Sequence, residues 1–464
     1  MKKVIAGALL LAGLAVAGIF AHQAVERDRE YRRLIAQGDE ALGRGQTFVA
    51  IEAFSGAIAL KRESMLAYLK RAEAHQHRGD STETLTAALH DLRTAAELDP
   101  AATRVQEQLG DVNVRLHRYA NASEHYEAYL RLDDRSAIVH YKLALASRGN
   151  GHLTRAISAL QDTVRLNPSF AEAFYVLGLC LNDRGQLAEA RAAFEQAVSI
   201  SPAFIPARDE LAEMYRLQGD ARHEIDQLEA LAALDAARPE RLIAVGLAYS
   251  RVGNPDSAVT ALGRAVERFH DYPGVYAALG QVWLRAAEER GDKAALRKAL
   301  EALEPVASQS SATSEILGLY GRALMLSGDN DLAEQAFKAA SLRFPTDSSV
   351  LPRFASLAER LGHLEDAREA LMRYAVLVDE DAEQAAHAER IGTLSLALND
   401  PSSAVRWYEQ SQMLSAPSAD MLARLADAQL RMGQPEAAKA TLDRALAKDD
   451  QNPAVRALAR RLRR

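Results

Sequence analysis

Hydrophobic positions between Ala171 and Pro202 recur three or four residues apart in two short segments, with one break at Arg184-Gly185-Gln186. This spacing predicts two amphipathic helices joined by a tight turn. Gly185 suits the left-handed residue that ends a helix, and Pro202 prevents the second helix from continuing. The positions expected to pack the two helices together are Phe174, Leu177, Gly178, Leu181, Ala190, Phe194 and Ala197.

The same turn recurs along most of the chain at a nearly constant interval. The few longer intervals fit insertions in turns, where extra residues cost little. The pattern predicts about twelve helix-turn-helix units over residues 31–453. Their turns are expected at Gly45, Gly79, His117, Gly151, Gly185, Gly219, Gly253, Gly291, Gly328, Gly362, Asn399 and Gly433.

The order of large and small residues in this unit, and the length of the interval, resemble the tetratricopeptide repeat, a helix-turn-helix module of about 34 residues. The family prefers Tyr at the position of Leu181, and a small residue where Glu224 stands in the sixth unit. The resemblance implies an all-α fold, a right-handed α-solenoid superhelix of stacked helix pairs. Because each unit buries its apolar face on its neighbours, we expect one elongated body in place of several globular domains.

Composition and charge narrow the function. The net charge of −7 and the pI near 6.0 argue against a nucleic-acid partner, because phosphate binding depends on Lys and Arg. Residues 454–464 are predicted to form a basic capping helix over the last repeat, and contact with anionic lipid is the alternative. The single cysteine, Cys180, excludes an intrachain disulfide and is expected to be a buried thiol.

The N-terminus begins with the basic residues 1–3 and continues with eighteen uncharged residues, 4–21. This length fits a transmembrane anchor near its lower limit and also a long signal peptide, with cleavage after Ala17 or Ala21. Bacterial membrane-anchored repeat proteins have a similar layout. We therefore expect an anchor in the bacterial inner membrane with the repeats in the periplasm, or a secreted or periplasmic protein after cleavage. Arginines after residue 26 leave the opposite orientation open.

Motifs for chemistry are missing from the sequence. It contains no HExxH zinc motif, no GxxxxGK[ST] phosphate loop, no GxSxG elbow and no dinucleotide GxGxxG, and its twelve histidines are dispersed. We therefore expect a non-enzymatic protein with no catalytic, metal-binding or cofactor-binding residues.

The resemblance also implies where a partner would bind. In this family the second, fifth, ninth and twelfth positions of the first helix form one stripe that lines the concave face. Aromatic, Arg and Asn side chains in such a stripe suit a groove for an extended peptide or a partner helix. The candidate protein-binding residues are Arg104, Tyr141, Arg148, Tyr175 and Asn182. The alternative is that these are ordinary surface residues and that the partner binds elsewhere.

These observations favour a scaffold that mediates protein–protein interactions in the assembly of a bacterial envelope complex. Two alternatives stay open. One is a homo-oligomeric structural element joined by end-to-end stacking, and the other is an enzyme whose site matches no common motif. The sequence leaves the oligomeric state, the partner and the pathway open.

Overall fold

The computed structural model describes residues 2–377 and 380–462, with side chains from residue 19 onward. Throughout these residues the regular elements are the helices α1 to α25, and no strand occurs among them. The predicted all-α fold built from short, repeated helices is confirmed. The chain divides into two compact units, residues 1–220 and 221–464. The right-handed superhelix stays a prediction.

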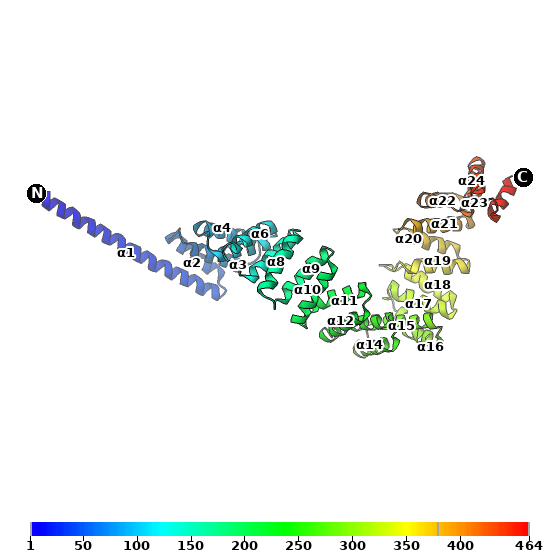
Figure 1. Cartoon of the computed structure of the whole chain (residues 1–464), viewed down its shortest axis with the longest axis horizontal. Helices are drawn as coiled ribbons and strands as arrows, with labels where there is room; N and C mark the ends of the chain where they lie inside the picture. The colour runs from blue at the N-terminus through cyan, green and yellow to red at the C-terminus, as the bar shows by residue number, and fades with distance from the viewer. Residues whose placement is uncertain (1, 378–379, 463–464) are drawn as a thin grey trace. The chain divides into compact units, whose positions relative to one another are not determined.

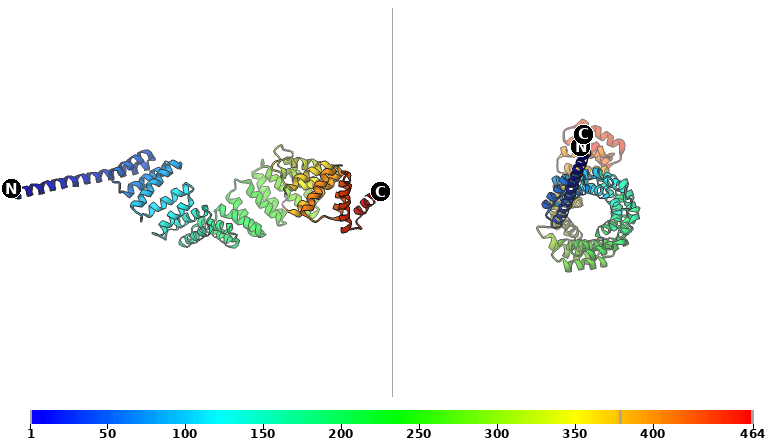
Figure 2. Two further views of the ribbon diagram at one scale, coloured as in Figure 1. Left: turned by 90° about the horizontal axis from the view of Figure 1, so that it is seen from above. Right: turned by 90° about the vertical axis from the view of Figure 1, so that its left-hand side faces the viewer.

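Unit 1 contains eleven helices in its described residues. Each helix of a pair packs on the other, beginning with α1 and α2 and ending with α9 and α10, and each pair also contacts the next (Figures 1 and 2). The helices are α1 (Lys2–Gly43), α2 (Thr47–Leu60), α3 (Met65–Arg78), α4 (Thr82–Leu98), α5 (Thr103–Arg115), α6 (Tyr119–Leu130), α7 (Ala137–Gly149), α8 (Leu153–Leu166), α9 (Ala171–Asp183), α10 (Leu187–Ile200) and α11 (Ile205–Gln218).

Unit 2 repeats this arrangement, with pairs from α13 and α14 to α23 and α24. Its helices are α12 (Ala221–Leu234), α13 (Pro239–Arg251), α14 (Pro255–Arg268), α15 (Pro273–Arg290), α16 (Lys293–Ala307), α17 (Ser314–Ser327), α18 (Asn330–Ser341), α19 (Val350–Leu361), α20 (Leu364–Ala375), α21 (Asp381–Ala397), α22 (Pro401–Leu414), α23 (Ala419–Arg431), α24 (Pro435–Lys448) and α25 (Pro453–Leu462).

A left-handed residue reverses the chain at the turns. Gly185 has φ 76°, a conformation that glycine adopts without steric cost. His117 (φ 56°) and Asn399 (φ 60°) take the same conformation although they carry side chains, and Asn is one of the residues that tolerate it best. The other positive φ angles in the described residues are at Gly45, Gly79, Gly151, Gly219, Gly253, Gly291, Gly328, Gly362 and Gly433. These twelve positions coincide with the turn positions read from the sequence.

In several helix pairs, a glycine on one helix lies directly against an aromatic ring on the other. A Cβ atom on Gly178 of α9 would lie 2.5 Å from Cε1 of Phe194 on α10, so the ring fits only because the side chain is absent. Phe194 is fully buried. The same contact between a glycine and a ring recurs in other pairs, at Gly38 and Phe54, Gly110 and Tyr126, Gly321 and Phe337, and Gly392 and Tyr408.

Glu224 departs from the small residue found at this position in α10. Ala190 is fully buried there, and Glu224 is also buried, with only 4% of its surface exposed. Its carboxylate accepts a hydrogen bond from Nη2 of Arg251 on α13. The partner is 43% exposed at its side chain, so water reaches the guanidinium while the carboxylate stays inside. One ion pair thus replaces the apolar contact.

The last helix, α25, covers the pair α23 and α24 with Val455 and Leu458, which are buried. Arg461 Nη1 lies 2.7 Å from Asp427 Oδ1 on α23. The basic capping helix predicted for residues 454–464 stays a prediction. Residues 463–464 lie outside the described residues.

No helix in the part of the chain that the structure describes is long and apolar enough to cross a membrane. Residues 4–18 of the predicted anchor or signal segment, 4–21, lie outside the residues whose side chains are described.

Candidate protein-binding site

Helices α7, α9 and α11 of unit 1 carry the region of the candidate site. Ser136 caps α7 by accepting a hydrogen bond from the backbone N–H of Val139, 3.4 Å away. Val139 is buried in the core that α7 shares with α9 and α10. Tyr141 and Tyr175 are separated by one repeat length in the sequence, so they occupy the same position on neighbouring first helices.

Tyr141 is half-buried against the segment that joins α8 to α9. Its ring centroid lies 4.8 Å from that of Phe170, at an interplanar angle of 45°. Such a tilted aromatic pair contributes about 0.5–1.5 kcal/mol beyond the buried area. Burial raises the pKa of the Tyr141 hydroxyl, and the carboxylate of Glu172 raises it further. The phenol is therefore neutral and available as a hydrogen-bond donor.

Tyr175 repeats this arrangement one step further along. Its ring packs against Phe204, which precedes α11, at 5.3 Å between centroids, and against Phe194 at 5.9 Å. Burial is the largest cause of the raised pKa of Tyr175, followed by the negative charge of Glu210. Both tyrosines are thus held in place by a phenylalanine from the next segment between repeats.

Arg148 and Asn182 lie on the same two helices as the tyrosines. Arg148 Nη2 on α7 is 3.3 Å from Asp183 Oδ2 on α9, and both side chains are partly exposed. Asn182 is half-buried, and its side chain makes no hydrogen bond to another described residue. An incoming backbone could therefore pair with the Asn182 amide without breaking an existing contact.

Arg104, the fifth candidate, lies on α5 and is paired with a residue of α3. Its Nη2 lies 2.5 Å from Glu73 Oε1 on α3, and the same carboxylate oxygen accepts a hydrogen bond from Gln108 Nε2 at 2.9 Å. The contacts of Arg104 connect the second and third repeats. Those of Tyr141, Arg148 and Tyr175 connect the fourth, fifth and sixth.

Lys142 is not among the candidate residues that the sequence pattern indicated, although it contacts two neighbouring side chains. Its Nζ lies 2.7 Å from Glu107 Oε1 and 2.8 Å from Asp111 Oδ2, so it joins α7 to α5. Burial lowers the pKa of Lys142, but the hydrogen bonds to both carboxylates raise it more, and the net pKa lies above the ordinary value. The signal was present as opposite charges about one repeat apart, 31 and 35 residues.

Carboxylates of α11 lie near Tyr175, which is on α9. Burial raises the pKa of Glu210, and the neighbouring charges of Asp209 and Asp183 raise it further, while Arg148 lowers it. A raised carboxyl pKa reflects negative charges held close together in a partly desolvated place. Asp209 and Asp183 are therefore close enough to act on Glu210.

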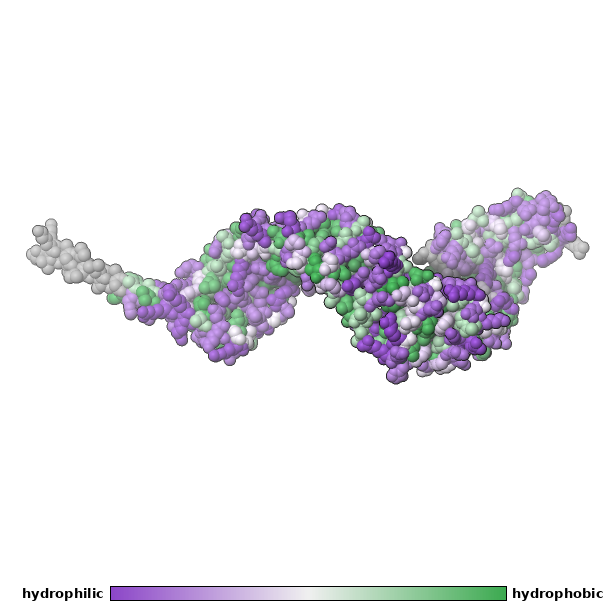
Figure 3. Space-filling model, turned by 60° about the horizontal axis from the view of Figure 1, so that its bottom comes forward, coloured by the Kyte–Doolittle hydropathy of each residue, from purple (hydrophilic) through white to green (hydrophobic). Residues whose placement is uncertain are grey.

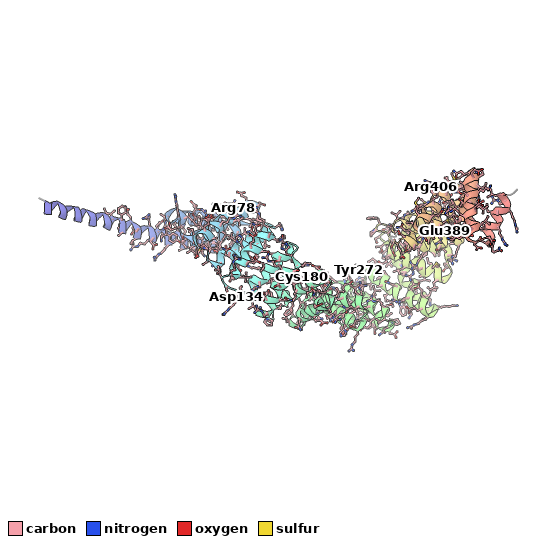
Figure 4. All side chains as sticks on the ribbon, turned by 45° about the horizontal axis from the view of Figure 1, so that its top comes forward. Arg78, Asp134, Cys180, Tyr272, Glu389 and Arg406 are labelled. Carbon is pink, nitrogen blue, oxygen red and sulfur yellow. The ribbon has the colours of Figure 1, made fainter. Side chains whose placement is uncertain are left out.

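The arrangement is suited to non-covalent binding. Cys180, on α9, is fully buried, and burial raises the pKa of its thiol, so the thiolate is disfavoured (Figure 4). Its predicted burial is confirmed. Within residues 2–377 and 380–462, no group of His, Cys, Asp and Glu is placed to hold a metal ion. Over the face shown in Figure 3, hydrophobic residues lie in small groups between hydrophilic ones.

Two models of one family match parts of the chain. Both describe the tetratricopeptide repeat, one over residues 141–203 and the other over residues 395–462. The first match begins at Tyr141 and includes Arg148, Tyr175 and Asn182. These two segments therefore match tetratricopeptide repeats. Such repeats bind other proteins or peptides.

Several solved structures are similar to this chain in parts or over most of its length. The C-terminal part of a TPR repeat-containing protein from Cytophaga hutchinsonii is 16% identical, with 53% of this chain and 99% of that chain covered and a TM-score of 0.45. Yeast Tom70 is 16% identical, with 94% and 99% covered and a TM-score of 0.39. MamA from Desulfovibrio magneticus RS-1 is 19% identical, with 38% and 97% covered and a TM-score of 0.35. No curated protein matches the chain.

Proposed function

We propose that this protein is a non-enzymatic scaffold whose tetratricopeptide repeats bind segments of partner proteins. The observation that supports it most is the pair of tyrosines on α7 and α9, each packed against a phenylalanine. Rings held in this way lose little freedom on binding, and rigid aromatic side chains are common binding hot spots. The bound segment would lie along the face that carries Tyr141, Arg148, Tyr175 and Asn182.

The chemistry of this face favours an extended or helical protein segment. Tyr141 and Tyr175 offer hydroxyl donors beside apolar ring surface, and the Asn182 amide can donate to and accept from a backbone. Arg148 is already paired with Asp183 at 3.3 Å, so a partner carboxylate or amine could exchange with one member of that pair. Arg104 lies beside Glu73 and belongs to this surface only if the bound segment extends to α3 and α5.

A binding experiment decides between this face and another. Detergent-solubilised membranes are passed over the immobilised full-length chain, and the retained proteins are compared for the wild type and for Tyr141→Ala with Tyr175→Ala. Loss of a hot-spot residue costs about 2 kcal/mol or more, which is about 30-fold in affinity. The partner should therefore be lost from the double variant.

A matched control separates this effect from a general loss of tyrosine. Tyr272 is in unit 2, where its Oη donates to Glu240 Oε1 at 2.9 Å (labelled in Figure 4). The Tyr272→Ala variant should retain the partner. Circular dichroism should show equal helix content in all variants, and unchanged capture by the double variant would reject the α7–α9 face.

We further propose that the scaffold serves a complex of the bacterial envelope. The eighteen uncharged residues 4–21 support this as a single inner-membrane anchor with the repeats in the periplasm, or as a signal removed on export. N-terminal sequencing of the purified protein distinguishes the two, because cleavage would expose residue 18 or residue 22. A chain that begins at residue 1 and is released from membranes by carbonate would count against both.

Self-association is a second candidate, because apolar residues protrude after α18. Phe344 is 99% exposed and Leu342 is 73% exposed, between α18 and α19. Contiguous exposed apolar side chains are typical of an interface, whereas single ones are ordinary on a free surface. Light scattering should then show a mass that rises with concentration in the wild type and stays constant in Phe344→Ser. A constant mass in the wild type would reject the homo-oligomer.

A further inference from the structure

One position of the first helix holds a tyrosine in some repeats and a smaller or aliphatic residue in others. On α11 it is Tyr215, whose Oη donates a hydrogen bond to Glu195 Oε1 at 2.7 Å. On α13 it is Tyr249, whose Oη donates to Glu229 Oε1, also at 2.7 Å. In both cases the carboxylate is on the second helix of the preceding repeat, 20 residues earlier. At these two places a phenol joins consecutive repeats through a hydrogen bond.

Helix α9 lacks this tyrosine. Leu181 stands one repeat length before Tyr215, and Gln161 stands one repeat length before Glu195, so both members of the pair are replaced. A groove of about 610 Å³ lies here between α8 and α10. Phe174, Leu177 and Leu181 of α9 supply its apolar lining.

Polar atoms of the groove are left without partners. Gln186, at the start of α10, lines the groove, and its Oε1 is buried without a hydrogen-bond partner in the described residues. Gln161 lines the opposite side and is exposed. A buried acceptor without a donor is costly, and a ligand hydroxyl would satisfy it.

The same replacement has the same result in unit 2. Ser395 on α21 occupies the position of Leu181, and a groove of about 340 Å³ lies between α20 and α22. Ser395 is fully buried, lines this groove, and its Oγ has no partner among the described residues. Met372 stands at the position of Gln161 and lines it too. A groove thus lies beside the replaced position in both units, and one of about 540 Å³ also lies beside Glu229, the partner of Tyr249.

We propose that the groove between α8 and α10 is a second binding site, which takes a tyrosine side chain from a segment of a partner protein. The ring would lie over Leu177 and Leu181, and its hydroxyl would donate to the side-chain oxygen of Gln161 or Gln186. On α11, Tyr215 and its carboxylate partner Glu195 show that a phenol can occupy this position between repeats. Tyrosine is favoured over Phe because the groove presents acceptors.

This site is separate from the face described above. Tyr175 packs toward Phe204, the segment that enters α11, whereas Phe174 and Leu181 line the groove between α8 and α10. One helix, α9, would then serve two ligands on two faces. A negative result at the α7–α9 face would therefore leave the proposal for the groove between α8 and α10 unaffected.

The first arm of the test uses N-acetyl-tyrosinamide as a probe of the full-length chain. Methyl NMR of Leu177 and Leu181 should show saturable shifts with a Kd on the order of 1 mM, as expected for one side chain. N-acetyl-phenylalaninamide should bind several-fold more weakly, and N-acetyl-alaninamide should not shift these methyl groups. Equal shifts with all three probes, or none with the tyrosine probe, would overturn the proposal.

The second arm fills the groove from inside. Leu181→Tyr combined with Gln161→Glu restores the pair found at Tyr215, and it should weaken the tyrosine probe at least tenfold. Ser395→Tyr fills only the equivalent groove of unit 2, so it should leave the shift at Leu177 unchanged. Unaltered binding by the filled variant, with wild-type circular dichroism, would also overturn the proposal. So would self-association that the filled variant abolishes, because the occupant would then be a second copy.

Discussion

Replacing Gly178 by Ala tests whether the two helices of a pair pack closely because a glycine leaves room for an aromatic ring. The added methyl carbon would lie 2.5 Å from Phe194 Cε1 and 2.6 Å from Cδ1. Carbon atoms in contact are normally about 3.5–4.0 Å apart, so the ring would have to move by about 1 Å. Phe194 is fully buried and cannot turn into solvent.

The magnitude follows from two opposing terms. Overpacking of a core costs about 1–3 kcal/mol, and a clash this close belongs at the upper end. Ala is better than Gly in a helix interior by about 1 kcal/mol, which acts in the opposite direction. We therefore expect the pair α9 and α10 to lose about 2 kcal/mol of local stability.

Native-state hydrogen exchange of the full-length chain is the suitable assay, because stacked repeats open locally. Peptides from α9 and α10 should exchange about 30-fold faster in Gly178→Ala, since each 1.4 kcal/mol is a factor of ten. Gly263→Ala is the matched control. A Cβ at Gly263, in the interior of α14, would meet nothing within 4 Å.

The control should change stability in the opposite direction. Without a clash, only the helix propensity term remains, and α14 should gain about 1 kcal/mol. If α9 and α10 exchange in Gly178→Ala as slowly as in the wild type, or more slowly, the reasoning about ring packing is refuted.

Two further predictions concern single side chains in unit 2. Arg251→Ala leaves the buried Glu224 carboxylate unpaired and should destabilise α12 and α13 by about 1–3 kcal/mol, discounted because the Arg251 side chain is 43% exposed to water. Glu224→Ala should be nearly neutral, because water already reaches Arg251. Hydrogen exchange that is equally fast in both variants would contradict this. Asp400 caps α22, and hydrogen bonds from Ser403 lower its pKa to about 2. Asp400→Ala should cost about 1 kcal/mol at pH 7. That difference should narrow in thermal unfolding as the pH falls from about 4 toward 2, because the cap contributes only while ionised; a difference independent of pH would count against it.

The repeated helix pair could be read from the sequence because its determinants are local. Gly185 and Gly178 each act within one pair, the first through its φ angle and the second by leaving room for a ring. Both requirements recur at a fixed interval, so periodicity alone reveals them. The confirmed part of the prediction is the all-α repeat, and the family models support it over residues 141–203 and 395–462.

Contacts between neighbouring pairs were harder to foresee. Lys142 bridges to Glu107 and Asp111 only because α5 and α7 present particular faces to each other, which a residue pattern within one helix does not specify. Arg104 fitted the binding stripe by position, yet the structure places its guanidinium on Glu73. The binding role of the five candidate residues stays a prediction.

The missing tyrosine at Leu181 shows a third case. The departure itself was visible in the sequence, but its consequence was not. Only the geometry of Tyr215 and Glu195 shows that the absent side chain would have spanned two repeats. A substitution that looks conservative within one helix thus removes a contact to the preceding repeat.

The closure of Gly178 on Phe194 lies wholly inside one helical hairpin. Duplicating or deleting the stretch of gene that encodes such a hairpin would therefore carry its packing along intact. Ion pairs between neighbouring hairpins, such as Arg148 with Asp183, would instead have to form with a different residue wherever the order of hairpins changes. During evolution, changes in the number of hairpins should thus be limited by the charged contacts between neighbouring hairpins. The packing inside each hairpin does not set this limit.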